Sequence, residues 1–313
     1  MATMKAVRIH SYGGSEVLKY EDTPRPDITD DEILVQVHAV GVNPVDWKIR
    51  EGYMQQGLNH KMPLILGWDV SGVVAKVGSN VNNFQTEDDV YAYTSLRRNG
   101  AYAEYIAIPA HEVAHQPKSL DYIAAASVPV AALTAYQALF DAAKLSAGQT
   151  VLIHAAAGGV GSFAVQLAKN KGARVIGTAS ARNHSFLKEL GVDEAIDYNQ
   201  VHFEDVVYDV DVVFDTIGDE VQERSWKVLK SGGILVSIVS PPSQSTATQH
   251  KVRAAFVAVQ PNKAQLAEIA ALVDAGILKP IVDTVLPLSE ARQAHELSQS
   301  GHMRGKIVLQ VIG

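Results

Sequence analysis

A glycine-rich segment that follows an apolar run has the residue types and spacing to bind a phosphorylated ligand. It reads TVLIHAAAGGVGSFAVQLAKNKGA, and Ala156, Gly158 and Gly161 occupy the three small-residue positions of a GxGxxG pattern. The pattern alone is weak evidence, but here it follows a predicted strand and opens a predicted helix. Unpaired N–H groups and the positive end of the helix dipole then favour a pyrophosphate at Gly158, Gly159, Val160 and Gly161.

The end of the next predicted strand indicates which dinucleotide binds. Enzymes that use NAD place Asp or Glu there, as an acceptor for the ribose 2′-hydroxyl. This chain instead reads GTASARNHSF, in which Ser180 can donate to a 2′-phosphate and Arg182 can pair with it. The sequence therefore predicts NADPH as the cofactor. A solvated charge at the start of the following helix is the alternative interpretation of Arg182.

Two hydrophobic patterns divide the 313 residues. From Met4 to about Pro117, short alternating runs punctuated by Gly and Pro predict the strands of a barrel-like all-β unit. From about Leu120, apolar strands alternate with amphipathic helices, which predicts a doubly wound parallel sheet of about six strands, a Rossmann sheet. The chain ends in GKIVLQV, and the pattern fits equally a strand that extends this sheet and one that returns to the first unit.

Composition excludes several classes of function. The net charge is −7 with no block of Lys and Arg, so we expect neither nucleic acid nor an anionic membrane as a partner. The chain has no cysteine, which rules out disulfides, thiol nucleophiles and cysteine-containing zinc sites. Its start shows no secretory pattern and no stretch is apolar enough to span a bilayer, so we expect a soluble, cytoplasmic protein.

Other catalytic motifs are weak or missing. The string HEVAH, from His111 to His115, matches the HExxH of zinc proteases, but Pro109 and Pro117 leave too little room for the helix that this chemistry needs. The segment is therefore interpreted as a surface turn. His154, inside an apolar strand, is interpreted as a hydrogen-bonded core or pocket residue rather than a catalyst. There is no GxSxG and no Walker GK[ST], so neither hydrolase nor phosphoryl-transfer chemistry is supported.

The chain resembles the zinc-lacking quinone oxidoreductases of the medium-chain dehydrogenase/reductase superfamily over nearly its whole length. The stretches that carry the resemblance are VGVNPVDWKIREG, PLILGWDVSGVVAKVG, ALTAYQAL, HAAAGGVG, the DY of EAIDY, FDTIG and GHMRGKIVL. The resemblance implies an α/β protein with a GroES-like β-barrel catalytic domain, from residues 1–122 and 262–313, and a Rossmann NADPH-binding domain, from residues 123–261. It also implies a homodimer.

The metal site of the zinc-dependent relatives is not expected here. In zinc-dependent alcohol dehydrogenases, a Cys stands at the position matching Asn43, and a His-Glu pair follows the position matching Gly67. This chain has Asn43, Trp68 and Asp69 at these places. A catalytic zinc needs three N, S or O side chains and Trp68 cannot ligate, so no metal is predicted. Without a Lewis acid, acceptors that delocalise negative charge themselves, such as quinones and α,β-unsaturated carbonyls, are favoured.

The resemblance therefore implies hydride transfer from NADPH to a quinone. An enoyl or alkenal reductase and a non-catalytic NADPH-binding regulatory protein stay open as alternatives. Tyr53 and Asn43 are the candidate catalytic residues, with Tyr53 as hydrogen-bond donor to the acceptor oxygen, although solvent can also protonate a hydroquinone anion. Asp46 is expected to order its loop. The implied cofactor contacts are Asn43, Thr134, Gly158, Gly159, Val160, Gly161, Ser180, Arg182, Tyr198, Ile217, Val239, Ser240, Arg304 and Lys306.

Overall fold

The computed structural model describes residues 2–301 and 303–312 and divides the chain into two compact units. Unit 1 comprises Met1–Val130, Gln260–Gly276 and Pro280–Gly313, and unit 2 comprises Ala131–Val259 and Ile277–Lys279. Unit 1 continues past the boundary expected after residue 122. The reason is that helix α3 (Tyr122–Ala126) packs on the strands of unit 1, where the Ser71 hydroxyl donates to the Tyr122 carbonyl at 2.5 Å.

Unit 1 is a β unit with two sheets. A seven-stranded sheet has the order β15-β16-β3-β5-β6-β8, with β7 also paired to β3, and a three-stranded sheet has the order β2-β1-β4. The larger sheet contains β3 (Glu32–Val42), β5 (Asp69–Val77), β6 (Asp89–Tyr93), β7 (Tyr105–Pro109), β8 (Val113–His115), β15 (Val282–Pro287) and β16 (Lys306–Gln310). The smaller contains β1 (Thr3–Ile9), β2 (Lys19–Pro24) and β4 (Leu64–Ile65).

The C-terminal strand lies in unit 1. Strand β16 pairs antiparallel with β3, with Ile307 opposite Val42 and Gln310 opposite Ala39. This pairing decides between the two placements that periodicity left open. The sequence analysis missed β15, which pairs parallel to β16 at the sheet edge. Its residues alternate between half-buried and exposed, so the run lacks the continuous apolar character of the other strands.

The helices of unit 1 include short ones in its N-terminal part and two longer ones in its C-terminal part. They are α1 (Pro44–Arg50), α2 (Gln55–Leu58), α3, α9 (Lys263–Asp274) and α10 (Ala291–Ser300), and α4 (Pro129–Tyr136) continues into unit 2. Three short 3-10 turns, Ser15–Val17, Ala110–Glu112 and Leu288–Glu290, complete the unit. The HEVAH segment forms the second of these turns and strand β8, so its two histidines do not share a helix face.

Unit 2 is a six-stranded parallel sheet with the order β11-β10-β9-β12-β13-β14. The strands are β9 (Thr150–Ile153), β10 (Arg174–Ala179), β11 (Glu194–Asp197), β12 (Val210–Asp215), β13 (Leu229–Ser237) and β14 (Arg253–Phe256). The connecting helices are α5 (Gly159–Asn170), α6 (His184–Glu189), α7 (Asp219–Ser225) and α8 (Gln244–Gln249). A π-helical segment, Gln137–Ala142, and 3-10 turns at Ala181–Asn183, Phe203–Asp205 and Trp226–Val228 add to them.

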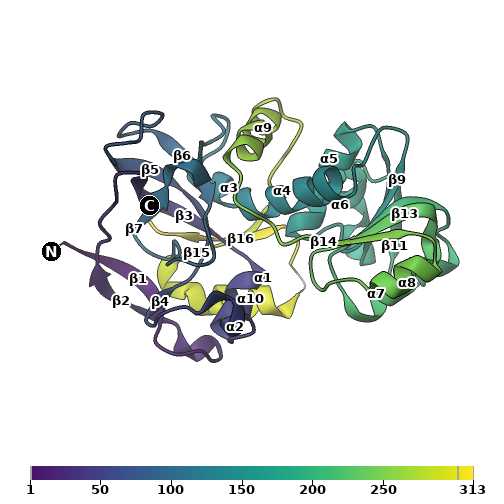
Figure 1. Ribbon diagram of the computed structural model, residues 1–313, viewed down its shortest axis with the longest axis horizontal. Coiled ribbons are helices and arrows are strands. Elements are labelled where there is room, and N and C mark those ends of the chain that lie inside the picture. The colour runs from purple at the N-terminus through teal and green to yellow at the C-terminus, as the bar shows by residue number, and fades with distance from the viewer. Residues whose placement is uncertain (1, 302, 313) are drawn as a thin grey trace. The chain divides into compact units, whose positions relative to one another are not determined.

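The strand order of unit 2 reverses at β9. Right-handed crossovers that leave β9 in opposite directions place their helices on opposite faces of the sheet. Figure 1 shows α5 and α6 on one face and α7 and α8 on the other. Between them, the strand residues Leu152, Val213 and Leu235 and the side chain of Trp226 form a buried apolar cluster. In the described part of the chain, no helix is long and apolar enough to cross a membrane.

Candidate functional site

The carboxyl edge of the unit 2 sheet gathers most of the predicted cofactor residues. Because parallel strands end at the same edge, the loops that follow them are neighbours. The glycine loop follows β9, Ser180 and Arg182 follow β10, Tyr198 follows β11, Ile217 follows β12, and Val239 and Ser240 follow β13. The strand reversal at β9 puts the glycine loop at the middle of this row.

The glycine loop forms the N-terminus of α5. Gly158 is the N-cap in extended backbone, and the first N–H groups of a helix have no acceptor within the helix. A Cβ on Gly161 would lie 2.3 Å from the Ala155 carbonyl oxygen, so only glycine allows α5 to pack this close to the loop. The free donors and the dipole suit an anion, and the cradle therefore fits a pyrophosphate.

Ala155 takes left-handed backbone at the start of this loop, with φ of 47°. That conformation is costly for a residue with a Cβ and persists only where neighbours hold it. Its N–H donates to the Thr178 hydroxyl at 3.3 Å, and the next N–H, of Ala156, donates to the Thr178 carbonyl at 3.0 Å. Thr178 on β10 thus fixes the loop that follows β9.

His154 is a buried core residue beneath the loop, as the sequence analysis expected, with 1% of its surface exposed. The Ser225 hydroxyl donates to the Val221 carbonyl at 2.7 Å, so it accepts from Nε2 of His154 at 3.0 Å. The Thr178 hydroxyl lies 3.2 Å from Nδ1 and can donate to it. Burial lowers the pKa of His154 to about 4, which keeps the ring neutral near pH 7.

The predicted 2′-phosphate end has neighbouring polar residues. Strands β10 and β11 pair with Ala179 opposite Asp197, so the loops carrying Ser180 and Tyr198 start side by side. The Ser180 hydroxyl accepts from the Asn183 side chain at 3.3 Å, which orients it at the start of the 3-10 turn that contains Arg182. Arg182 is exposed and Tyr198 is 55% exposed, so both are accessible to a ligand.

Unit 1 contains a buried ionic cluster around Asn43. The Lys306 ammonium donates to the Asn43 side-chain oxygen, to the Val42 carbonyl at 3.1 Å and to the Asp69 carboxylate at 3.2 Å. The Asn43 amide donates to Asp69 at 2.8 Å. Burial raises the pKa of Asp69, and the Lys306 charge offsets part of that rise. An ammonium has three N–H donors, and all three have acceptors within this cluster.

Asp46 lies next to this cluster and is completely buried. Its carboxylate accepts from the Asn43 N–H at 2.8 Å and from the Tyr102 hydroxyl at 3.0 Å, so it does order the loop before α1. A chain of contacts continues from Tyr102 to His295 and on to Arg50. Burial raises the pKa of Asp46 to about 7 and lowers the pKa of His295 to about 3, so both groups resist carrying charge.

The remaining predicted residues are more dispersed. Tyr53 follows the C-terminal end of α1, whereas Asn43 caps its N-terminal end, so seven helical residues separate the two candidate catalytic residues. Tyr53 is 72% exposed, with its ring edge-on to Trp47. Thr134 is buried in α4, and Arg304 is exposed just before β16.

The residues around Asn43 do not fit a zinc ion. Trp68 is buried, and its indole N–H donates to the Arg98 carbonyl at 3.2 Å. An indole has no lone pair available to bind a metal. The side-chain oxygens of Asn43 and Asp69 already accept hydrogen bonds from the Lys306 ammonium. Across the described residues, no group of three His, Cys, Asp or Glu side chains has the geometry of a metal site.

Comparison with known proteins gives the family. A family described as "Alcohol dehydrogenase GroES-like domain" matches residues 29–118, and one described as "Zinc-binding dehydrogenase" matches residues 190–309. A 2-methylene-furan-3-one reductase from Solanum lycopersicum is 36% identical, over 99% of this chain and 79% of that protein. The chain belongs to the zinc-independent, quinone oxidoreductase-like medium-chain dehydrogenases/reductases. Unit 1 is therefore GroES-like, and unit 2 is a Rossmann domain.

Two further relatives extend the comparison within this family. An NADPH-dependent alkenal/one oxidoreductase from Arabidopsis thaliana is 36% identical over 98% of this chain and 79% of that protein. The solved structure of a quinone oxidoreductase from Coxiella burnetii superposes with a TM-score of 0.94 and 38% identity, over 99% of this chain and all of that one. The protein is therefore an oxidoreductase that uses a nicotinamide cofactor.

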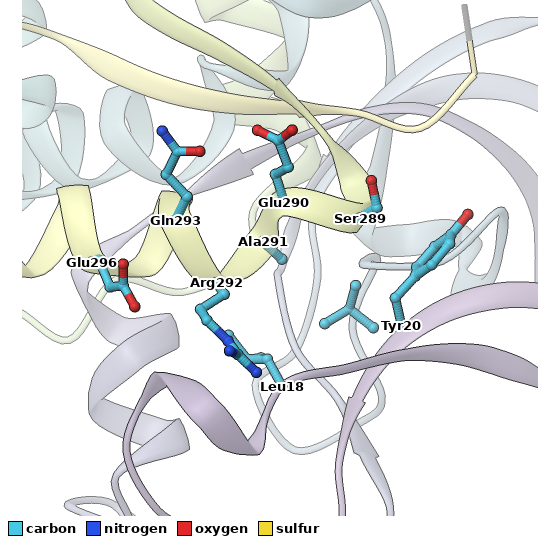
Figure 2. Close-up of a pocket in the computed structure, with 9 residues that line it drawn as sticks. Leu18, Tyr20, Ser289, Glu290, Ala291, Arg292, Gln293 and Glu296 are labelled. Atoms are coloured by element: carbon cyan, nitrogen blue, oxygen red, sulfur yellow. The ribbon is translucent and has the colours of Figure 1, made fainter.

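A surface pocket of about 340 Å3 lies elsewhere in unit 1. Figure 2 shows it between the first turns of α10, with Glu290 and Arg292, and the segment with Leu18 and Tyr20. Within the described residues, its lining includes none of the predicted site residues. It therefore forms no part of the candidate site.

The sequence did not indicate Thr178 and Asp215 as site residues, nor the buried contacts of Asp69 and Lys306. Thr178 and Asp215 end or nearly end apolar strands, and Asp69 and Lys306 begin strands. A polar residue at the end of a buried apolar strand was the available signal, and Asp215 stood in the quoted FDTIG segment. Its partners were not visible, because they come from other strands of the sheet.

Proposed function

We propose that this oxidoreductase transfers hydride from NADPH to a quinone. The main supporting observation is the carboxyl edge of the unit 2 sheet, where a glycine cradle at α5 is followed by a strand end with Ser180 and Arg182 instead of a carboxylate. A carboxylate would repel a 2′-phosphate, whereas an arginine attracts it. The NADPH-dependent relative from Arabidopsis thaliana supports the same choice of cofactor.

Each segment of the edge has a distinct part in this proposal. The N–H groups at Gly158 to Gly161 bind the pyrophosphate, and Ser180, Arg182 and Tyr198 bind the adenosine 2′-phosphate end. Ile217, Val239 and Ser240 border the nicotinamide ribose, with Thr134, Asn43, Arg304 and Lys306 as further proposed cofactor contacts. The bound cofactor supplies a hydride from its nicotinamide ring. The protein orients the ring and excludes water.

The proposed acceptor is one that stabilises charge without a Lewis acid. A quinone delocalises the negative charge it receives, so it needs only orientation and a proton. Tyr53 is the proposed hydrogen-bond donor to the acceptor oxygen, since its side chain is exposed and accessible. Asn43 is the second proposed catalytic residue, through the amide that Lys306 and Asp69 orient.

Oxidation of NADPH with 1,4-benzoquinone tests the proposal. Parallel assays use a simple alkenal and the saturated aldehyde of the same length, and NADH replaces NADPH in each. We expect turnover with the quinone and little with the saturated aldehyde, whose carbonyl needs polarisation. Faster turnover of the saturated aldehyde would contradict the proposal. Nucleotide binding without turnover of any acceptor would instead favour a non-catalytic, NADPH-binding regulatory protein.

Reduction of α,β-unsaturated carbonyls is the second candidate function. The tomato and Arabidopsis relatives, by their descriptions, act on an enone and on alkenals or alkenones. Both reactions need the same hydride donor and the same lack of a metal, so the cofactor site does not distinguish them. The ratio of kcat/KM for benzoquinone and for the alkenal ranks the two acceptor classes.

A homodimer in the cytoplasm completes the proposal. Strand β14 is an edge of the six-stranded sheet, and Phe256 on it is 45% exposed. An open strand edge with an apolar side chain favours pairing with a second copy. Light scattering coupled to size-exclusion chromatography is expected to give twice the chain mass. Fractionation of cells that express the protein tests its location.

A further inference from the structure

A single buried carboxylate joins two of the loops at the carboxyl edge of the unit 2 sheet. Asp215 is the last residue of β12 and is 0% exposed. One of its oxygens accepts from the N–H groups of Ile217 at 3.0 Å and Gly218 at 2.8 Å. The other accepts from the Gln222 amide at 2.9 Å and the Ser237 hydroxyl at 2.8 Å.

The second oxygen reaches the loop that follows β13. Ser237 is the last residue of β13 and lies opposite Asp215 in the parallel register. Its hydroxyl accepts in turn from the N–H groups of Val239 at 3.3 Å and Ser240 at 3.4 Å. The Gln222 amide also donates to the Ser240 carbonyl at 3.2 Å. The backbone of both loops is therefore fixed by one side chain and its immediate partners.

The two loops approach each other closely as a result. Gly218 has a φ of 83°, and a Cβ there would lie 3.2 Å from the Val239 side chain. Ile217 and Val239 nevertheless stay exposed, by 45% and 37%. Two apolar side chains are thus presented to solvent from backbone that is firmly held, which suits contact with a flat ligand.

The chemistry of the anchor requires a carboxylate. Burying a charged group is costly unless hydrogen bonds compensate it, and Asp215 has four donors. An asparagine of the same shape would turn its NH2 group either toward two backbone N–H groups or toward Gln222 and Ser237. In the first case, donors would face donors at Ile217 and Gly218. In the second, Gln222 would have to turn its oxygen toward the new NH2 group and would lose its bond to the Ser240 carbonyl, so in each case one of the two loops would lose part of its anchor.

We propose that Asp215 is a positioning residue for the nicotinamide end of the cofactor, acting through the Ile217 and Val239 loops. The inference rests on the proposed NADPH-binding function. It predicts that Asp215 affects one half of the dinucleotide and not the other. The adenosine 2′-phosphate end lies at the loops after β10 and β11, which Asp215 does not contact.

The test compares two ligands with one substitution. In Asp215→Asn, the Kd for NADPH is expected to rise about tenfold or more. The Kd for 2′,5′-ADP, which lacks the nicotinamide half, is expected to stay within about twofold of its value in the unmodified protein. Isothermal titration calorimetry measures both. General loosening of the unit would weaken both ligands together. Equal weakening of both, or no change in either, would overturn the inference.

Asp211 provides a matched control on the same strand. It is also a buried carboxylate, accepting from the Thr150 N–H at 2.9 Å and the Gln149 amide at 3.2 Å and pairing with Lys230, but it lies at the amino end of β12. Asp211→Asn is expected to lower the melting temperature as Asp215→Asn does, with unchanged affinity for both ligands. Loss of NADPH affinity in this control would overturn the inference.

If Asp215→Asn does not fold, a less disruptive substitution provides the test. Ser237→Ala removes the link to Val239 and Ser240 and keeps the carboxylate, so the same ligand pattern is expected with a smaller rise in the NADPH Kd. An unchanged NADPH Kd in Ser237→Ala would count against the inference. If the unmodified protein binds neither NADPH nor 2′,5′-ADP, the proposed cofactor fails and the inference fails with it.

Discussion

The two units neutralise buried polar groups in different ways. Unit 1 buries full charges of both signs, with Lys306 against Asp69, and Arg50 at the end of a chain that begins at Asp46. At its carboxyl edge, unit 2 buries Asp215 and satisfies it with N–H and O–H donors that carry no charge, whereas the buried Asp211 at the opposite edge pairs with Lys230. His154, also in unit 2, stays neutral.

The difference indicates what each network does. Removing one partner of a buried ion pair strongly lowers the stability of the fold, because the remaining charge stays buried without a counter-charge. The residues of the ionic network in unit 1 bind each other and leave few donors for a ligand. In unit 2, two of the four donors to Asp215 are backbone N–H groups of the loop after β12, and a third, the Ser237 hydroxyl, is bonded in turn to the loop after β13. The unit 1 network therefore holds its own fold and orients Asn43, and the unit 2 network fixes the backbone of the proposed binding edge.

Removing the cation from unit 1 is expected to have the largest effect. Lys306→Met leaves Asp69 buried without its counter-charge and should lower the free energy of unfolding by about 3–5 kcal/mol, measured by urea denaturation. The control is Lys169→Met in unit 2, where the ion pair with Asp193 is about one-third exposed and is expected to contribute less than about 1 kcal/mol. Similar losses in the two variants would remove the distinction between the networks.

The pH dependence of stability should have opposite signs at Asp46 and His154. The pKa of Asp46 is raised to about 7, so its contribution is full below its unfolded pKa near 3.8 and is lost as the pH rises through about 7. The pKa of His154 is lowered to about 4, so its contribution is full above its unfolded pKa near 6.5 and is lost as the pH falls toward 4.

Neutral variants separate these two contributions. Between pH 5 and 6, Asp46 makes the free energy of unfolding fall with rising pH, and Asp46→Asn removes this dependence. His154 makes the free energy of unfolding rise with pH over the same range, and His154→Gln removes that dependence. Each contribution is up to about 1.4 kcal/mol per pH unit. Unfolding by urea at several pH values gives the slopes. Slopes that change in the same direction for both variants would show that the two buried groups do not differ as described.

A substitution in the glycine loop tests the close backbone packing of unit 2. In Gly161→Ala the new Cβ would meet the Ala155 carbonyl, so we expect a loss of about 1–3 kcal/mol of stability together with weaker NADPH binding. Gly57 in α2 of unit 1 is the control, because a Cβ there meets no atom within 4 Å. Gly57→Ala is expected to be neutral or slightly stabilising. Thermal melts with and without NADPH measure both effects, and an unimpaired Gly161→Ala would contradict the close packing.

The smallest expected effect concerns the choice of nucleotide. Arg182→Ala should raise the KM for NADPH about tenfold, about 1.4 kcal/mol, and barely change the KM for NADH. Lys188→Ala, an exposed cation of α6 in the same unit, is the control and should leave both values unchanged. Equal weakening of both cofactors by Arg182→Ala would refute the role of this residue at the 2′-phosphate.

Much of unit 2 could be predicted from local sequence. The apolar strands, the helices between them and the glycine loop follow from periodicity and from Gly and Pro at the ends of elements. Strand β15 could not be predicted in this way, since its residues are only half-buried or exposed and lack a continuous apolar run, and its pairing with β16 is not visible in the sequence. The placement of β16 beside β3 was also undetermined, because a strand's partner depends on contacts distant in sequence.

The sequence by itself determined the residue types on which the proposed chemistry depends: a glycine cradle, a serine and an arginine after the strand where NAD enzymes place Asp or Glu, and a tryptophan where a zinc ligand would stand. These features act through the chemistry of single residues and short segments, so they can be recognised without a fold. Only the tertiary structure decided that Lys306 reaches Asn43 and Asp69 and that Asp215 anchors two loops. Hydrogen bonds of this kind join residues up to 263 positions apart, and pairing over that distance is set by the packing of the whole unit.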